Sequence, residues 1–340
     1  MNASKKRKSE STERVMYKKR SQPALENSPP VTSIKDLIEI GKTIKFYKNL
    51  DTIMLWRIVP YLEELDKMIG MKTLKESIFY QVIYYLQNMH TQNENNEYLH
   101  TLIIGESGTG KTTVSRIIGK IYQSMGILSY SGPFRIAYRD DFIAEYLGQT
   151  AIKTRKLLNS CIGGVLFIDE VYSLGSGVKD RDSFSKEALD TITAFLSEHK
   201  NDFCCIAAGY EDDIKKCFLG GNKGLERRFP WVHIIDKYTP TELAEVLLSM
   251  ISDMKWITDV SKTDIADIIK NNIDYFKNSG GDIETFISKC KMTHSKRVFP
   301  MDNIYKFIIT KKDMLEAIDL IKKHKINDDK DEGRYLPMYM

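Results

Sequence analysis

The stretch Leu102-Ile103-Ile104-Gly105-Glu106-Ser107-Gly108-Thr109-Gly110-Lys111-Thr112-Thr113 decides the fold of this 340-residue chain. An apolar run ends in a glycine-rich turn, and apolar residues then recur at the helical positions 114, 117, 118 and 121. The turn reads G-x-x-x-x-G-K-T between a strand and a helix, which is the context that a phosphate-binding loop requires. A glycine turn before an ordinary helix is the simpler alternative, but it leaves the match at every fixed position unexplained.

The residues of this loop have defined chemical roles toward a nucleotide. The glycines let the backbone curl so that its N–H groups point at phosphate oxygens, and the helix adds the positive end of its dipole. The Lys111 ammonium is expected at the β- and γ-phosphates, and the Thr112 hydroxyl at a Mg²⁺ ion. We therefore expect ATP and Mg²⁺ as cofactors, with phosphate contacts from Gly105, Glu106, Ser107, Gly108, Thr109, Gly110, Lys111, Thr112 and Thr113.

Composition narrows the class of protein. The formal charge of +4 is small and its signs are interspersed, so nucleic acid is not expected as the dominant partner. The five cysteines show no metal-ligand spacing, and no signal peptide is recognisable, which favours a reducing intracellular compartment. Since no apolar run approaches the ~18 residues of a membrane span, no membrane partner is expected. These features predict a soluble, cytoplasmic protein.

The beginning of the chain differs from the rest. Residues 1–31 are polar and basic, and we interpret them as a disordered tail. Lys6-Arg7 and Lys18-Lys19-Arg20 resemble a bipartite nuclear-import signal, although short basic clusters often belong to a solvated tail. A nuclear location is therefore an alternative to the cytoplasm. Residues 32–59 have helical periodicity and are expected to form an N-terminal helical segment.

Short apolar runs separated by helical patterns predict the architecture. The runs are the strand before the phosphate loop and residues 133–137, 165–168, 203–208 and 232–235. This alternation predicts an α/β fold, a P-loop NTPase with a parallel sheet covered by helices on both faces, at residues 60–236. Four amphipathic helical patterns follow, which predict a small all-helical lid domain at 237–325. Residues 326–340 are expected to be a C-terminal tail.

Two acids end the apolar run at 165–168. Ligands of parallel sheets bind at the carboxyl edge of the strands, so Asp169 and Glu170 are expected near the phosphate loop. Asp169 would orient Mg²⁺, and Glu170 would polarise the water that attacks the γ-phosphate. Acids that end a strand often only begin a turn, but their place downstream of the phosphate loop favours a nucleotide site.

Two further segments carry candidate functional residues. Arg227 and Arg228 follow the fourth strand, and a guanidinium can stabilise transition-state charge on phosphate or only make surface salt bridges. Tyr146-Leu147-Gly148 lies in a polar loop between the second and third strands. By itself this tyrosine would more often pack in the core.

Together these motifs resemble an AAA+ ATPase. The runs at 142–155, 163–174, 206–210 and 237–243 are similar to the group of red-type rubisco activase and sporulation protein K (CbbX/SpoVK-like). The similarity covers about residues 60–325. It implies a ring of identical subunits, usually a hexamer, with ATP between subunits and a central pore that grips a protein client.

The resemblance also implies roles for single residues. Gly70, in the stretch 66–70, would lie near the adenine, and Arg228, with Arg227 as a second candidate, would reach a neighbouring subunit's nucleotide. Tyr146-Leu147-Gly148 matches the family's pore loop.

Two departures from the family pattern concern the sensing of the nucleotide. Tyr210 stands where many AAA+ proteins have a polar sensor, and Gly281 where the lid helix often has an arginine.

The sequence thus favours an ATP-driven remodeller of an unidentified protein client. One alternative is a DNA-directed AAA+ motor or loader, for which the only indication is the basic N-terminal tail. The other is a nucleotide-switched scaffold whose ring does not pull. Glu170 and Arg228 argue against the scaffold.

Overall fold

The computed structural model describes residues 26–43, 45–91, 97–146, 148–175, 183–220, 222 and 224–335, with side chains up to residue 323. The two basic clusters, Leu147 and the last five residues lie outside these ranges. Within the part of the chain that is described, no helix is long and apolar enough to cross a membrane.

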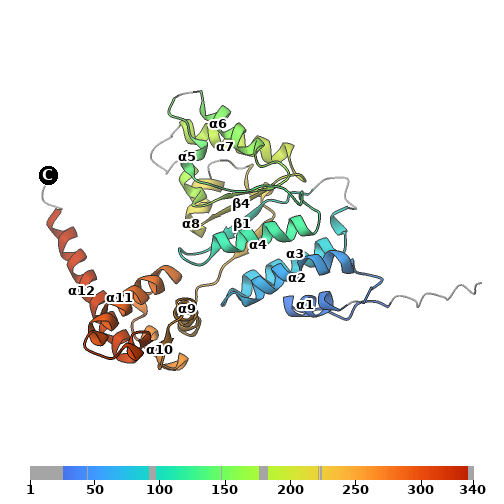
Figure 1. Cartoon of the computed structure of the whole chain (residues 1–340). Coiled ribbons are helices and arrows are strands. Elements are labelled where there is room, and N and C mark those ends of the chain that lie inside the picture. Colours follow the sequence, from blue (N-terminus) through green and yellow to red (C-terminus); the bar gives the residue numbers. More distant parts are fainter. Residues whose placement is uncertain are drawn as a thin grey trace, which may run out of the picture.

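A five-stranded parallel sheet forms the centre of the molecule (Figure 1). Its order is β2-β3-β4-β1-β5, and the register places Ile103 of β1 between Ala208 of β4 and His233 of β5. The expected α/β fold is confirmed. The strands are β1 (Thr101–Ile104), β2 (Phe134–Ala137), β3 (Val165–Ile168), β4 (Cys204–Gly209) and β5 (Trp231–Ile234).

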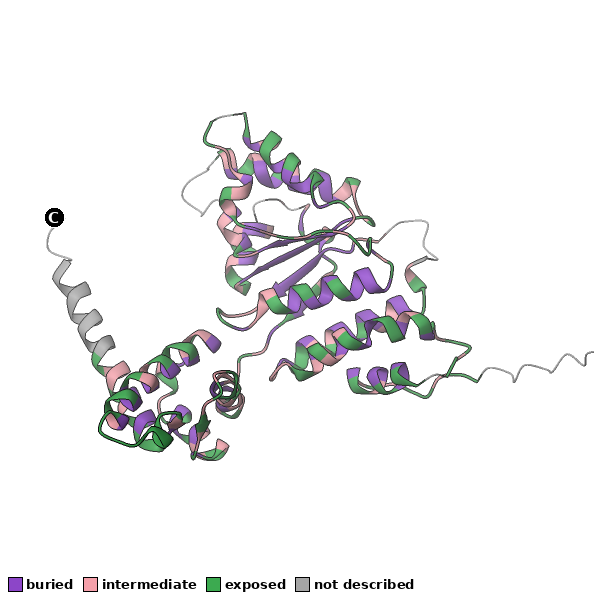
Figure 2. Cartoon of the chain, viewed as in Figure 1, coloured by how far each residue is buried: buried purple, intermediate pink, exposed green. Residues whose placement is uncertain are grey.

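Helices cover both faces of the sheet, as Figure 2 shows by the buried colour of the central strands. Successive side chains of a strand point to opposite faces, so Ile103 joins one core and Leu102 the other. The first face carries α1 (Ile34–Lys42), α2 (Thr52–Lys67), α3 (Lys72–Leu86) and α4 (Lys111–Ser124). The second carries α5 (Arg139–Phe142), α6 (Thr150–Asn159) and α7 (Ser183–Glu198).

Short helical turns connect these elements. Those around the sheet are η1 (Met89–Thr91), η2 (Val171–Leu174), α8 (Glu211–Asp213), the π-helical turn η3 (Ile214–Leu219) and η4 (Glu226–Arg228). Two more lie after the sheet, η5 (Ile273–Tyr275) and η6 (Asn303–Tyr305).

The N-terminal helices are part of the first core. Ser33 caps α1 with a capping box that includes Asp36, and Asp51 caps α2. Helix α2 continues across residues 59 and 60, where the sequence placed a domain boundary, and its buried Leu55 and Leu62 share a core with α4. Helices α1 and α2 are therefore packed on the same face of the sheet as α4.

Residues after 236 form a separate apolar core around Leu247, Ile269 and Phe286. Its helices are α9 (Pro240–Asp253), α10 (Lys262–Lys270), α11 (Gly280–Val298) and α12 (Lys311–Tyr335). The expected helical lid is confirmed, and it also contains two short strands, β6 (Ile257–Thr258) and β7 (Ile308–Ile309), which pair in parallel. Two-residue strands are too short to show a period of two in the sequence. Helix α12 also extends into the expected tail.

Candidate nucleotide site

The phosphate loop connects β1 to α4, and two of its side chains donate hydrogen bonds to its backbone carbonyls. Gly108 and Gly110 adopt φ values of 69° and 85°, which glycine adopts without steric cost. The Thr109 hydroxyl donates to the carbonyl of Glu106 at 2.8 Å. Lys111 Nζ donates to the carbonyl oxygens of Gly105 at 3.1 Å and Glu106 at 2.8 Å. The lysine thus lies inside the curl of the loop.

Electrostatics at Lys111 suit the binding of an anion. Burial lowers the pKa of its ammonium from the ordinary value, and the carboxylates of Asp169, Glu106 and Glu170 act in the opposite direction. A bound phosphate would add negative charge beside Lys111 and so favour the charged ammonium further.

The two acids predicted for this site follow β3 and face the loop. A cavity of about 340 Å³ is lined by residues 107–113 of the loop, by Asp169 and Glu170, and by Glu284 of the lid. Thr112 and Asp169 line the same space, as the metal assignment requires. Glu170 has φ 49° and ψ 45°, a left-handed conformation that is strained for a side chain with a Cβ atom. The sequence pattern therefore identified most of the lining.

Two tyrosines complete the cavity, and only Tyr210 was noticed in the sequence. The rings of Tyr172 and Tyr210 lie 5.7 Å apart, and Lys111 Nζ lies 5.5 Å from the centre of the Tyr210 ring. A Cβ atom on Gly209 would come within 2.9 Å of the Tyr172 ring, so glycine permits this close packing. Burial raises the pKa of Tyr172 to about 12. The sequence feature that could have predicted Tyr172 as a lining residue is its position two residues after Glu170.

The lid reaches the phosphate loop through backbone atoms. A Cβ atom on Gly280 would lie 2.3 Å from the carbonyl oxygen of Gly108, and one on Gly108 would lie 2.5 Å from the nitrogen of Gly281. The sequence offered no sign of this contact, because its two sides are far apart along the chain. Glu284, one turn further along α11, lines the phosphate cavity. The lid therefore presents backbone and a carboxylate to the phosphate loop and its cavity.

Gly70 lies at the junction between sheet and lid. Its φ is +67°, and a Cβ atom there would lie 3.1 Å from the Glu242 carboxylate and 3.2 Å from the Tyr238 ring. Gly70 is not among the residues that line the phosphate cavity. Met68 and Met71 flank it and lie beside Gly110. This stretch therefore links the phosphate loop to the start of the lid.

The two arginines of the turn η4 differ in their surroundings. Arg228 is half-buried, and its Nε donates to the Ser197 hydroxyl at 2.7 Å while Nη1 donates to the Gly224 carbonyl. Arg227 is exposed and has no hydrogen bond or ion pair with the described residues. Neither lines the phosphate cavity of its own subunit. Arg227 is therefore without a partner among the described residues, whereas Nε and Nη1 of Arg228 are bonded within the subunit.

The predicted pore loop lies between α5 and α6. Tyr146 is 67% exposed, so it does not pack in the core. Gly148 has φ +80° and open space around it. The base of the loop is fixed where the Ala144 N–H donates to the Thr150 hydroxyl at 3.2 Å.

Comparison with known proteins gives the family. Residues 101–220 match the profile described as "ATPase family associated with various cellular activities (AAA)". A "Putative cfxQ-like protein R730" of Acanthamoeba polyphaga mimivirus is 40% identical over 277 residues, which are 80% of this chain and 67% of that protein. The chain is an AAA ATPase of the CbbX/SpoVK-like group.

Further relatives of this AAA ATPase support the same family assignment. The chloroplastic ribulose bisphosphate carboxylase/oxygenase activase of Cyanidioschyzon merolae is 32% identical over 71% of this chain and 80% of its own. Stage V sporulation protein K of Bacillus subtilis is 39% identical over 57% of this chain and 60% of its own length.

Solved structures share the fold at lower identity. The FIGL-1 AAA domain in complex with ADP has a TM-score of 0.54 at 15% identity, covering 82% of this chain and 92% of its own. A mutant of Thermotoga maritima RuvB has a TM-score of 0.53 at 17% identity, covering 75% of this chain and 72% of its own.

Proposed function

We propose that this AAA ATPase binds ATP with Mg²⁺ and hydrolyses it. The observation that carries the proposal is the convergence of Lys111, Thr112, Asp169 and Glu170 on one cavity. The hydroxyl and carboxylate oxygens of Thr112 and Asp169 are ligands that Mg²⁺ prefers, so these two residues would hold the ion. Bound there, Mg²⁺ would neutralise charge on the phosphates.

The other residues would act directly on the nucleotide. The backbone N–H groups of the phosphate loop and the Lys111 ammonium would bind the β- and γ-phosphates. Glu170 would accept a proton from the water that attacks the γ-phosphate. Tyr210, which lies beside Lys111, would contact the γ-phosphate in place of a polar sensor residue.

We further propose that the chain works as a ring, with six subunits as in the family, that pulls on a protein client. The ATPase domain would include α1 and α2 and end at residue 236, and the lid would begin at residue 237 and include α12. The exposed and unpaired Arg227 supports a site completed by a neighbouring subunit, because a guanidinium supplied in this way stabilises the transition state. The exposed Tyr146 supports a loop that grips an extended chain.

Turnover with alternative clients tests this function. ATP hydrolysis by the full chain would be measured alone, with an unfolded protein and with single-stranded DNA. We expect the unfolded protein to stimulate turnover and Glu170→Gln to lower it at least ~10²-fold while ATP still binds, since a general base typically contributes that much. Stimulation by DNA alone would show that the client is DNA and not a protein. Unchanged turnover in Glu170→Gln would show that another residue is the general base.

A further inference from the structure

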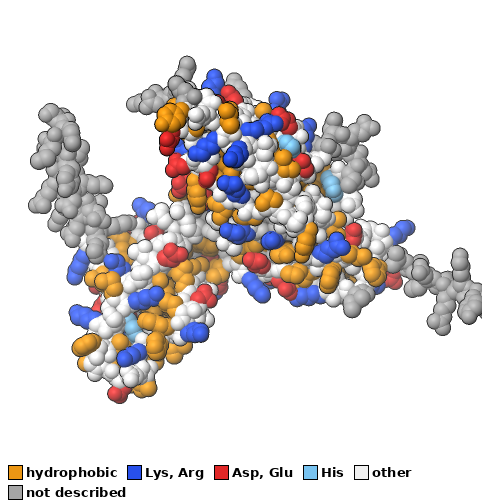
Figure 3. All heavy atoms as spheres, turned by 45° about the horizontal axis from the view of Figure 1, so that its top comes forward, with side chains coloured by type: hydrophobic (Ala, Val, Ile, Leu, Met, Phe, Trp, Pro, Cys, Tyr) orange, Lys and Arg blue, Asp and Glu red, His pale blue; other side chains and the backbone are white. Residues whose placement is uncertain are grey.

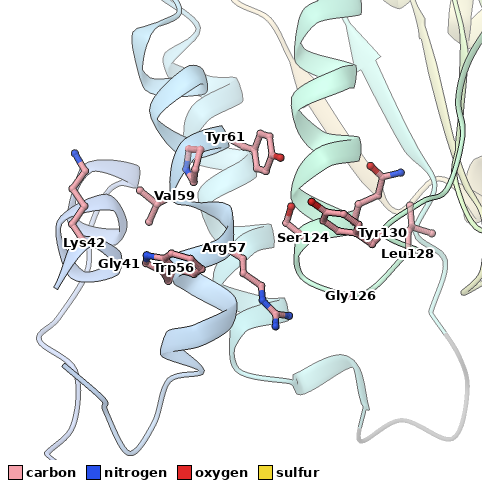
Figure 4. A pocket seen from close by; sticks show the side chains of 12 residues that line it. Gly41, Lys42, Trp56, Arg57, Val59, Tyr61, Ser124, Gly126, Leu128 and Tyr130 are labelled. Atoms are coloured by element: carbon pink, nitrogen blue, oxygen red, sulfur yellow. The ribbon is translucent and has the colours of Figure 1, made fainter. Parts of the chain in front are cut away.

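A large hollow lies away from the phosphate loop, between α2 and the end of α4. It has a volume of about 780 Å³. Figure 4 shows Trp56 and Arg57 of α2 on one side and Ser124 and Tyr130 on the other, with open space between them. Trp56 is 66% and Tyr130 is 84% exposed. Single exposed aromatic residues are common, but contiguous exposed apolar surface marks interaction sites, so what matters here is whether the apolar lining continues beyond Trp56.

An apolar extension continues from Trp56. A second cavity of about 340 Å³ shares this residue and is lined by Phe46, Ile53, Thr43, Thr52 and Lys45. Phe46 and Ile53 are each more than half exposed. The two cavities together, here called the N-terminal groove, thus have an apolar end, a central tryptophan and a polar end.

Some charged and polar side chains of the groove have a partner within the described chain and others have none. Lys42 is paired with Glu63 and Lys45 with Glu26, at 2.5 and 2.8 Å. Arg57, by contrast, is exposed and makes no hydrogen bond or ion pair within the described chain. The hydroxyl of Thr52 is buried and has no hydrogen-bond partner there.

Arg57 and the composition of the N-terminal residues together indicate the charge that an occupant of the groove should carry. Residues 1–25 contain eight Lys or Arg and two Glu, and they join the described chain at Glu26, which is bound to Lys45 of the groove. The unpaired guanidinium of Arg57 favours an acidic occupant. The net positive charge of residues 1–25 argues against that segment as the occupant, because like charges would meet.

We propose that the N-terminal groove binds a segment of a protein partner that carries carboxylates next to aromatic or aliphatic side chains. Apolar anchors would pack against Trp56 and Ile53, and a carboxylate would pair with Arg57 in bidentate geometry. A nucleic-acid strand is disfavoured, since tracking phosphates requires many free cations. On the face drawn in Figure 3, acidic and basic side chains are instead intermixed.

Binding is tested with the full chain, without nucleotide, and with a fluorescent random copolymer of glutamate and tyrosine as the probe. Polyglutamate, a lysine–tyrosine copolymer and oligo-dT are the comparison ligands. The variants are Trp56→Ser and Arg57→Glu. Matched controls are Tyr80→Ser, an equally exposed aromatic on α3, and Lys270→Glu, the same charge change in the lid.

We expect the glutamate–tyrosine copolymer to bind better than polyglutamate and the lysine–tyrosine copolymer. Trp56→Ser and Arg57→Glu should each weaken it by at least about tenfold, as loss of a central anchor does, while both controls bind as the unaltered chain. Both altered side chains are exposed, so folding should be preserved. Copolymer binding that is absent, or unaffected by both variants, would overturn the proposal. Groove-dependent binding of oligo-dT instead would assign the groove to nucleic acid.

Discussion

Replacing Gly280 by alanine should separate the lid from the phosphate loop. The new Cβ atom would lie 2.3 Å from the Gly108 carbonyl oxygen, far inside normal contact distance. Both sides of this contact are backbone, so no flexible side chain can move aside. Overpacking of this kind costs about 1–3 kcal/mol. If ATP binds only while the lid is docked, its apparent affinity should fall roughly 5- to 150-fold.

A matched control isolates the contact. Gly281 lies in the same first turn of α11, and a Cβ atom there would meet nothing within 4 Å. Gly281→Ala therefore makes the same chemical change with the same gain in helix propensity, up to about 1 kcal/mol. The difference between the two variants measures the contact with Gly108 alone.

The assay is titration with a fluorescent ATP analogue, together with thermal melting. Gly280→Ala should lose affinity and turnover without a lower melting temperature, while Gly281→Ala should keep both. Equal affinities in the two variants would refute the reasoning, since the lid contact would then carry no part of nucleotide binding. A much lower melting temperature in Gly280→Ala would show that the clash disrupts folding instead.

Four further substitutions test the remaining assignments. Lys111→Ala should abolish ATP binding measured by calorimetry, because it removes the ammonium inside the phosphate loop; near-normal affinity would contradict the site. Arg227→Ala should lower turnover about 10³-fold, with partial recovery in mixtures with Lys111→Ala subunits, as expected of an arginine acting across subunits. Arg228→Ala should mainly lower the melting temperature, because it loses the bonds to Ser197 and Gly224; the reverse pattern would restore Arg228 as the acting residue. Tyr146→Ala should leave melting and basal turnover unchanged and abolish stimulation by an unfolded protein, and a destabilised variant would contradict a gripping role.

Local pattern was enough to predict the sheet and much of the phosphate site. The glycines and Lys111 act within one turn of chain, and Asp169 and Glu170 follow directly from the end of a buried strand. Such features depend on neighbours a few residues away. Parallel topology then places the ends of β1 and β3 at the same edge, so their residues meet without further information.

The features that sequence did not reveal depend on contacts between distant segments. The approach of Gly280 to Gly108 joins the lid to the loop, and nothing near either glycine distinguishes it from a helix start or a turn. Both arginines of η4 are candidates in the sequence, and only the contacts of Arg228 with Ser197 on α7 and with the Gly224 carbonyl distinguish them. Tertiary packing, rather than local propensity, decides these cases.

At position 170, the left-handed backbone favours glycine, whereas hydrolysis of ATP would require a carboxylate. A residue with a Cβ atom at φ 49° and ψ 45° loses roughly 1 kcal/mol relative to glycine, yet glycine has no carboxylate to accept a proton. A gene copy released from the need to hydrolyse ATP would become more robust to heat by exchanging this glutamate for glycine or asparagine. Retention of glutamate at position 170 across a lineage would therefore record continuing selection for turnover, and its loss would mark the descendants that kept the fold for another purpose.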